Sequence, residues 1–326
     1  MTARRGPVIA AFLAVYLIWG STYLGIRFAI ETIPPLTLSA VRFGVAGLIL
    51  LAVAAVRGVA HATRAQWRTG IIVGALLMTG NACVGLAEQR IPSGVAALLV
   101  AMTPVFMVVL EWLRPRGKRP TAGVIVGLLL GLAGVAALVG PGSLGGSRID
   151  PVGAAIVIAG SFAWSLGSIY SRHAPRAPSA VMMTGMQMFA GGIFVGLMAV
   201  GAGELSRFDP SAVSARSLAA LVYLLVFGSL IAFTAFVYLL RVSTPARVAT
   251  YAYVNPVVAV ILGWLFAGET ISARMLIAAA IIVGGVALIT VAEARTPRGA
   301  ATKPTSDAGD GAIPRHTGDF PVTDAV

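Results

Sequence analysis

The chain is a succession of long apolar runs separated by short polar joints, and few folds accept this pattern. A helix that crosses the hydrocarbon core of a bilayer needs about 20 mainly apolar residues. Short joints also require successive helices to pack antiparallel. The sequence therefore predicts an all-α integral membrane protein. We expect ten spans, at residues 8–27, 35–56, 69–89, 92–113, 120–140, 151–171, 178–200, 217–240, 245–267 and 273–292.

Composition supports this class. Hydrophobic residues make up 58% of the chain and charged residues 11%, whereas a soluble domain is roughly a quarter charged. A net charge of +12 would suggest nucleic-acid binding in a soluble chain. In a membrane protein, basic residues in short loops set the orientation instead. We therefore expect the lipid bilayer, and no nucleic acid, as a partner.

The basic residues fall mainly on one side of the predicted spans. With the N-terminus in the cytoplasm, 17 of the 24 Lys and Arg residues lie on the cytoplasmic side, six lie outside, and Arg42 lies within a span. By the positive-inside rule both termini are cytoplasmic. Residues 293–326 lack apolar periodicity and are rich in Ala, Gly, Pro and Asp, so we expect a disordered cytoplasmic tail.

Matched residues indicate an internal repeat. Trp19 and Trp164 are 145 residues apart, and Pro104 and Pro256 are 152 residues apart, with the offset shifting only in a joint. Chance matches are common for Gly and Ala in membrane helices but not for paired Trp and paired mid-helix Pro. The pattern favours a duplicated chain.

The two copies are expected at residues 8–140 and 151–292, with five helices each. An odd number of helices places the second copy upside down relative to the first. Inverted repeats are typical of secondary transporters, whose substrate site lies near the midplane between the repeats.

The stretch Gly80–Pro104 joins two apolar runs through a polar corner and then places a proline deep inside the second run. Proline removes one backbone hydrogen bond, which membrane helices tolerate where neighbours or cavity water satisfy the freed carbonyl. We expect Pro104 and Pro256 to kink their helices at matching depths and to act in gating.

Three motifs carry a family resemblance: Trp19–Tyr23 (WGSTY), Val41–Phe43 (VRF) and Gly80–Pro104 (GNACVGLAEQRIPSGVAALLVAMTP). Together they resemble the EamA branch of the drug/metabolite transporter superfamily, in particular the YedA-like exporters. The likeness covers residues 8 to about 292. It implies two inverted five-helix EamA repeats in the bacterial inner membrane. It also implies export of small metabolites such as amino acids, or of drug-like compounds, and says little about the substrate.

Polar side chains within the spans are the candidates for the substrate site, because each is costly in hydrocarbon unless it faces a partner or water. A mainly apolar pocket with a few polar groups suits zwitterionic or amphipathic solutes. The candidates are Trp19, Ser21, Tyr23, Arg42, Asn81, Glu88, Trp164, Ser168, Gln187 and Asn255. Gln187 stands where the first repeat has Arg42, so the two halves are no longer chemically equivalent.

Arg42 and Glu88 are two charged groups at similar expected depth near the outer ends of their spans. One reading is an ion pair between them. The other is a direct role for either group in binding the substrate or a coupling proton.

Other classes of function have less support in the sequence. Three scattered histidines and the absence of a Walker-type phosphate loop predict no metal, no cofactor and no enzyme activity. A non-transporting or flippase-type membrane subunit stays open as an alternative, as does a membrane-embedded enzyme. The glycines of the fifth and tenth spans favour close helix packing, within the chain or between protomers of a homodimer.

Overall fold

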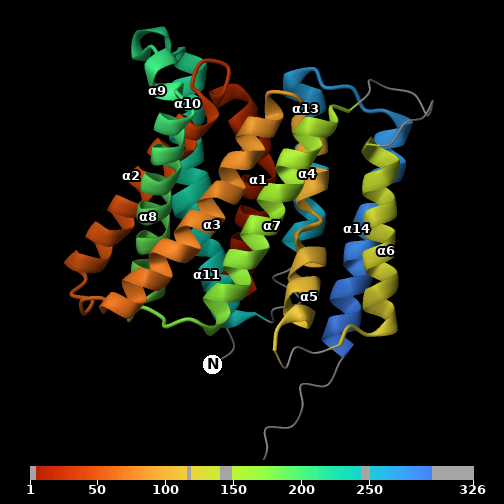
Figure 1. Cartoon of the computed structure of the whole chain (residues 1–326), viewed down its shortest axis with the longest axis horizontal. Helices are drawn as coiled ribbons and strands as arrows, with labels where there is room; N and C mark the ends of the chain where they lie inside the picture. Colours follow the sequence, from red (N-terminus) through yellow and green to blue (C-terminus); the bar gives the residue numbers. More distant parts are fainter. Residues whose placement is uncertain (1–4, 116–118, 140–148, 244–249, 296–326) are drawn as a thin grey trace, which may run out of the picture.

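The computed structural model describes residues 5–115, 119–139, 149–243 and 250–295, and every regular element in these ranges is a helix. Nine helices of the described part are long and apolar enough to cross a bilayer, and the shorter apolar helix Val254–Ala267 provides a tenth. The predicted all-α membrane fold is confirmed (Figure 1).

The first repeat contains five spans, of which the fourth is divided. Its helices are α1 (Arg5–Ala29), α2 (Pro35–Val56), α3 (Arg64–Glu88), α4 (Ser93–Val100), α5 (Thr103–Leu113) and α6 (Ala122–Val139). Helix α3 begins five residues before the expected span. Thr63 and Gln66 explain this, because their side chains and backbone N–H groups form a reciprocal capping box.

The second repeat also has a divided span. Its helices are α7 (Pro151–His173), α8 (Ala180–Gly201), α9 (Glu204–Arg207), η1 (Pro210–Ala212), α10 (Ala215–Tyr223), η2 (Leu224–Ile231), α11 (Ala232–Val242), α13 (Tyr251–Ala267) and α14 (Ala273–Arg295). Element η2 is a π-helical segment within the eighth span. The start of the expected ninth span, at residues 245–249, lies outside the described residues. So does the predicted tail from residue 296 onward, and α14 ends at Arg295.

The two repeats run in opposite directions. Helix α1 begins at the end of the bundle where α14 finishes, and α7, the counterpart of α1, runs the opposite way (Figure 1). Corresponding helices pack on one another: α2 on α8, α4 on α13, and α6 on α14. Helix α3 packs on α7, the first helix of the other repeat. Its counterpart, the span formed by α10, η2 and α11, packs in the same way on α1. This exchange of equivalent contacts fits two inverted repeats.

Pro104 lies at a break between two helices rather than at a kink inside one. Ala101 and Met102 form a turn, and Pro104 stands in the first turn of α5. Pro104 has no N–H for the Val100 carbonyl, which accepts instead from Thr103 Oγ1 at 2.6 Å. In contrast, α13 continues through Pro256. The two prolines therefore have different effects on their helices.

Glycines bring α6 and α14 together. A Cβ atom built on Gly127 would lie 2.6 Å from the Gly285 carbonyl oxygen, and one on Gly285 would lie 2.8 Å from that of Gly127. Only glycine allows this approach. These contacts lie within one chain, and the homodimer stays a prediction.

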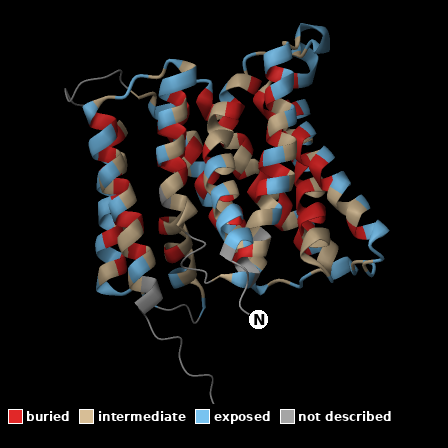
Figure 2. Ribbon diagram, turned by 180° about the vertical axis from the view of Figure 1, so that it is seen from behind, coloured by how far each residue is buried: buried red, intermediate tan, exposed pale blue. Residues whose placement is uncertain are grey.

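Across the bundle, the buried residues face the interior and the exposed residues lie along the outside (Figure 2).

Acidic side chains of the second repeat cap helices of the first. Glu204 Oε1 accepts from Leu36 N–H at 3.2 Å, and Glu204 Oε2 accepts from Thr37 N–H at 2.8 Å. Glu269 accepts from the N–H groups of Ser93 and Gly94 at 2.7 and 3.1 Å. A carboxylate is stabilised by the free N–H groups and the dipole at a helix N-terminus. The caps therefore fix the N-terminal ends of α2 and α4 to the opposite repeat.

An ion pair also joins the two repeats at the start of α7. Asp150 caps α7 by accepting from Val152 N–H at 2.8 Å, and it forms an ion pair with Arg90 at 3.1 Å. The hydrogen bond from Val152 and then the one from Arg90 lower the pKa of the exposed Asp150 carboxyl. Asp150 therefore stays ionised at neutral pH.

We expect Glu204→Ala to reduce thermal stability, because it leaves the buried N–H groups of Leu36 and Thr37 without an acceptor. A lost cap of this kind costs roughly 1–2 kcal/mol. Melting of the purified protein in detergent measures the change. Asp209→Ala is the matched control, since Asp209 bonds only within its own exposed turn. Equal melting temperatures for the two variants would contradict the role of the Glu204 cap.

Candidate functional site

A cavity of about 790 Å³ lies between the two repeats. Its wall takes residues from both repeats, and most of the lining side chains are apolar or aromatic. A few polar groups are placed among them, as in sites for small organic molecules. The polar and aromatic lining residues are Trp19, Thr22, Tyr23, Arg42, Phe43, Asn81, Thr103, Glu111, Ser161, Trp164, Arg172, Ser229, Phe233, Tyr251, Asn255 and Thr290.

The cavity opens toward one end of the bundle. Glu111 and Arg172, in the last turns of α5 and α7, line it near the end where α1 begins, and Arg172 is exposed. At the opposite end the lining stops at Ile26 and Val84, which are 4% and 6% exposed. Further residues there, such as Ile91, are also buried. The site is thus accessible from one side and closed on the other.

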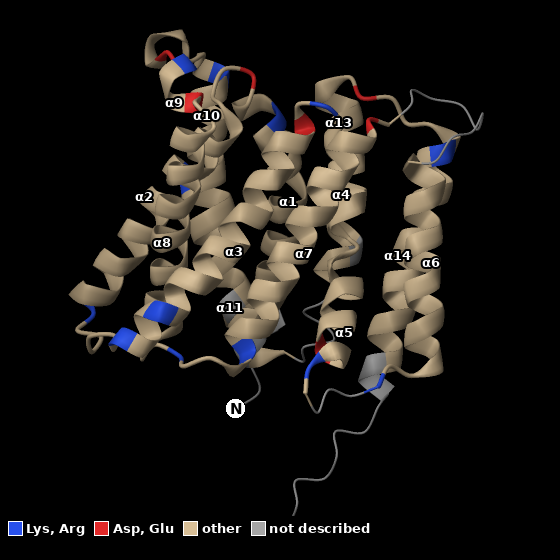
Figure 3. Ribbon diagram, in the orientation of Figure 1, with Lys and Arg blue, Asp and Glu red and all other residues tan. Residues whose placement is uncertain are grey.

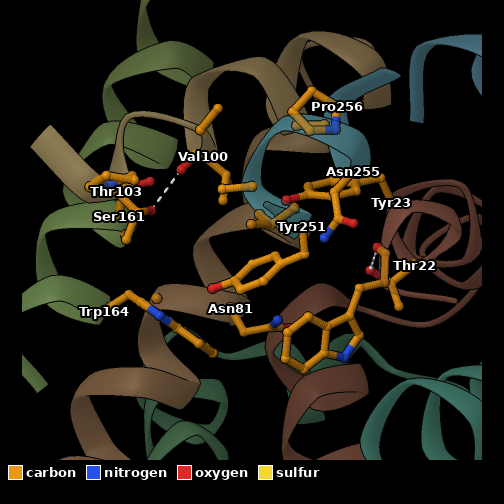
Figure 4. Close-up of a pocket in the computed structure, with 18 of the residues that line it drawn as sticks. Thr22, Tyr23, Asn81, Val100, Thr103, Ser161, Trp164, Tyr251, Asn255 and Pro256 are labelled. Atoms are coloured by element: carbon orange, nitrogen blue, oxygen red, sulfur yellow. Dashed lines mark hydrogen bonds between the residues drawn. The ribbon is translucent and has the colours of Figure 1, made fainter. Parts of the chain in front are cut away.

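Aromatic side chains form the middle of the wall. Trp19 Nε1 donates to the Gly228 carbonyl at 3.2 Å, and the Trp19 ring lies edge-on to Tyr251 with a centroid distance of 5.2 Å. Trp164, the counterpart of Trp19, also lines the cavity. Figure 4 shows Trp164, Tyr251 and Asn81 reaching into the same space from three different helices. These rings offer a surface for the apolar part of a solute.

Asn255 links α13 to α1 beside Pro256. Its side chain is 8% exposed. In the amide orientation that satisfies hydrogen bonding, its nitrogen donates to the carbonyl oxygens of Tyr16 and Tyr251 at 3.3 and 3.2 Å. Asn255 therefore holds the start of α13 against α1 at the cavity (Figure 4).

Arg42 brings a buried guanidinium to the cavity wall. Its side chain is only 5% exposed. Nε donates to Ser229 Oγ at 2.9 Å, Nη1 donates to Asn81 Oδ1 at 3.4 Å, and the Phe43 ring centroid lies 4.6 Å from the guanidinium carbon. All of these partners are neutral.

The ion pair between Arg42 and Glu88, one of the two readings of the sequence, is absent among the described residues. Neither Glu88 oxygen has a hydrogen-bond partner among the described residues, and no described carboxylate lies within ion-pair distance of Arg42. Equal depth along neighbouring helices did not bring the groups together, because Arg42 faces η2 and its Ser229.

Glu88 lies beyond the closed end of the cavity and is fully buried. Arg27 on α1 donates to its backbone carbonyl. Val84, one helical turn before Glu88 on α3, lines the cavity. Glu88 is thus separated from the cavity wall but adjacent to it.

Three other candidates lie outside the wall. Ser21 Oγ donates to the Ile18 carbonyl at 2.9 Å and shares a hydrogen bond with the Tyr223 hydroxyl. Gln187 is buried where α8 meets α3, and a Cβ on Gly74 would collide with its backbone oxygen. Ser168 is half-buried and does not line the cavity.

Sequence reasoning missed several polar groups of the wall. Ser161 is 4% exposed, and its hydroxyl has no hydrogen-bond partner in the described part of the chain. Gly228 and Ser229 belong to the π-helical segment η2. The signal available in the sequence was the Gly228-Ser229 pair inside an apolar run, because such pairs often mark irregular points in a helix. Irregular π-helical segments in turn often occur at functional sites.

Comparison with known proteins gives consistent results. The model of the EamA-like transporter family matches residues 6–140 and 151–291. An inner membrane transporter of Escherichia coli K12, YedA, is 39% identical over 287 residues, covering 87% of this chain and 91% of YedA. The transporter YvbV of Bacillus subtilis is 25% identical over 289 residues, again covering 87% and 91%.

A crystal structure of a protein 24% identical in sequence superposes with a TM-score of 0.59 and covers 88% of this chain and 98% of its own. This likeness shows a shared fold. The matched family model covers both repeats and nearly all of the helical part. The chain is a multi-pass inner membrane transporter of small molecules and belongs to the EamA-like transporter family.

Proposed function

We propose that this chain is a secondary active transporter that exports small amphipathic metabolites, such as amino acids and related compounds or drugs. The cavity between the inverted repeats is the observation that carries the proposal, since it is open at one end and closed at the other. Its volume suits a solute of amino-acid to drug size. Its mainly apolar wall with a few polar and charged groups suits an amphipathic solute.

Alternating access requires the open and closed ends to exchange. The helix ends that form the open side carry Arg172, while buried apolar residues such as Ile26 close the other side. The break before Pro104 and the proline within α13 both lie in the cavity wall. We assign to them the bends about which the repeats rock.

We further propose that the open end faces the cytoplasm. The structure places basic residues of the joints α2–α3 and α7–α8 at the end where α1 begins (Figure 3). Basic joints stay on the cytoplasmic side. The structure then represents the inward-facing state, with both termini in the cytoplasm.

Cysteine labelling tests this orientation in a Cys83→Ser background. His61 lies in the exposed joint after α2, and Ser211 lies in the exposed connection between α8 and α10 at the other end. We expect an impermeant thiol reagent added to intact cells to modify Ser211→Cys and to leave His61→Cys unmodified. The reverse pattern would place the open end of the cavity outside the cell.

We propose that protons drive export and that Glu88 carries the coupling proton. An ionised carboxylate without hydrogen bonds is costly in a buried site, so the neutral acid is favoured while the outer end is closed. Opening of that end would expose Glu88 to water and permit proton exchange. On the other side, Val84, one turn before Glu88 on α3, lines the cavity wall.

Flux in reconstituted vesicles tests transport and coupling together. We expect an imposed pH gradient to accelerate wild-type flux of amino acids or their derivatives. Glu88→Gln should abolish this acceleration while solute exchange without a gradient continues, because amide groups do not titrate. Glu31→Gln is the matched control, since Glu31 is exposed and pairs with Arg216. Unchanged pH-driven flux in Glu88→Gln would contradict the assignment.

The prolines can be tested through accessibility. Pro104→Ala restores the N–H that α4 and α5 need to join, and Pro256→Ala restores one bond in α13. Because the repeats are inverted, we expect the two variants to shift labelling of a cavity residue, Ser161→Cys, in opposite directions. Wild-type flux and unchanged labelling in both variants would show that neither proline acts in gating.

A further inference from the structure

We propose that Arg42 is the carboxylate receptor of the cavity and that the transported compounds are amphipathic carboxylates. This inference rests on the proposed transport function and narrows its substrate class. The observation behind it is a charged side chain, 95% buried in the bundle, that lines the cavity and has only neutral described partners.

A buried cation in a membrane helix is costly unless a counter-ion or a polar partner stabilises it. The acidic residues nearest to the cavity are engaged elsewhere or separated from Arg42. Glu111 forms an ion pair with Arg114 at 3.0 Å, and Glu88 lies beyond the closed end. Among the described residues no carboxylate completes the Arg42 site. A solute carboxylate is the group that can do so.

The guanidinium is held in position and keeps donors available. Its planar group carries five N–H donors and binds a carboxylate through two parallel hydrogen bonds. Ser229 accepts from Nε, and the weak 3.4 Å contact with Asn81 is the only bond described for the two terminal nitrogens. Nη2 points at Gly228, where a Cβ atom would lie 3.0 Å away. Glycine therefore leaves room beside Nη2.

The surroundings of Arg42 define the rest of the solute. Trp19, Phe233 and Met188 line the same cavity and offer apolar contact area. The counterpart of Arg42 in the second repeat is Gln187, which does not line the cavity. The cavity thus presents one buried cation, which fits one carboxylate on an apolar or aromatic body.

Paired probes that differ only at the carboxyl group test the proposal. N-acetyl-L-phenylalanine is compared with N-acetyl-L-phenylalaninamide, and L-phenylalanine with L-phenylalaninamide, through thermal stabilisation of the purified protein. We expect both acids at millimolar concentration to stabilise the wild type and both amides to have little effect. Equal effects of acids and amides, or no effect of either acid, would overturn the carboxylate site.

Variants of Arg42 test whether this residue causes the preference for acids over amides. We expect Arg42→Gln to weaken acid binding by roughly tenfold or more, because a charge-assisted pair is lost. Arg42→Lys should retain part of it, since it keeps the charge without the fork. Arg216→Gln is the matched control, because Arg216 is exposed and pairs with Glu31. An unchanged acid preference in Arg42→Gln would overturn the proposal.

Gly228→Ala provides a second test of the Arg42 site in case Arg42→Gln fails to fold. The added methyl group crowds Nη2 without removing the charge, so acid binding should weaken and amide binding should not change. Unaltered acid binding in this variant would count against the site.

Flux measurements separate the two proposals. Acids that bind without being transported contradict the transport function, whereas equal flux of acids and amides contradicts only the carboxylate site.

Discussion

The structure depends on one constraint: in a bilayer, every backbone N–H and C=O group must find a partner without help from water. Regular helices meet it along most of their length. Where the fourth span breaks, the Val100 carbonyl accepts from Thr103 Oγ1, and the Thr103 carbonyl accepts from Ser165 of α7. Where η2 widens, the Gly228 carbonyl accepts from Trp19. Each irregularity is stabilised by a side chain of the opposite repeat or of its own turn.

These irregular segments also line the cavity, and the reason is physical. Helical backbone at membrane depth can be interrupted only where it is buried in protein or faces water in a cavity. Pro104, Gly228 and Ser229 all lie in the wall. The irregular segments that shape the cavity can be tolerated only in its wall, because elsewhere their backbone groups would face lipid without partners. The N-terminal ends of α2 and α4 are fixed differently, by the caps that Glu204 and Glu269 provide across the repeats.

The sequence allowed the spans, the duplication and the family to be predicted, because these depend on length, hydropathy and short motifs. Depth could be estimated from the rise of 1.5 Å per residue. The direction of a side chain around its helix could not, since it depends on which neighbours pack there. Arg42 and Glu88 lie at similar depth, but Arg42 faces η2 and Glu88 is buried beyond the closed end of the cavity. Ser229 was missed for the same reason.

The two repeats have kept their packing and lost their chemical equivalence. Trp19 and Trp164 both line the cavity, so the aromatic surface is shared between the halves. Arg42 lines it, whereas its counterpart Gln187 is buried between helices. In the proposed mechanism, exchange between the inward-facing and outward-facing states requires only that the helices of the two repeats pack alike. The equivalent helix contacts in the two repeats preserve this similarity. Recognition of a solute has no such requirement, because the solute is not symmetric. In the proposed mechanism, one repeat can therefore supply the charged group while both repeats take part in the rocking movement.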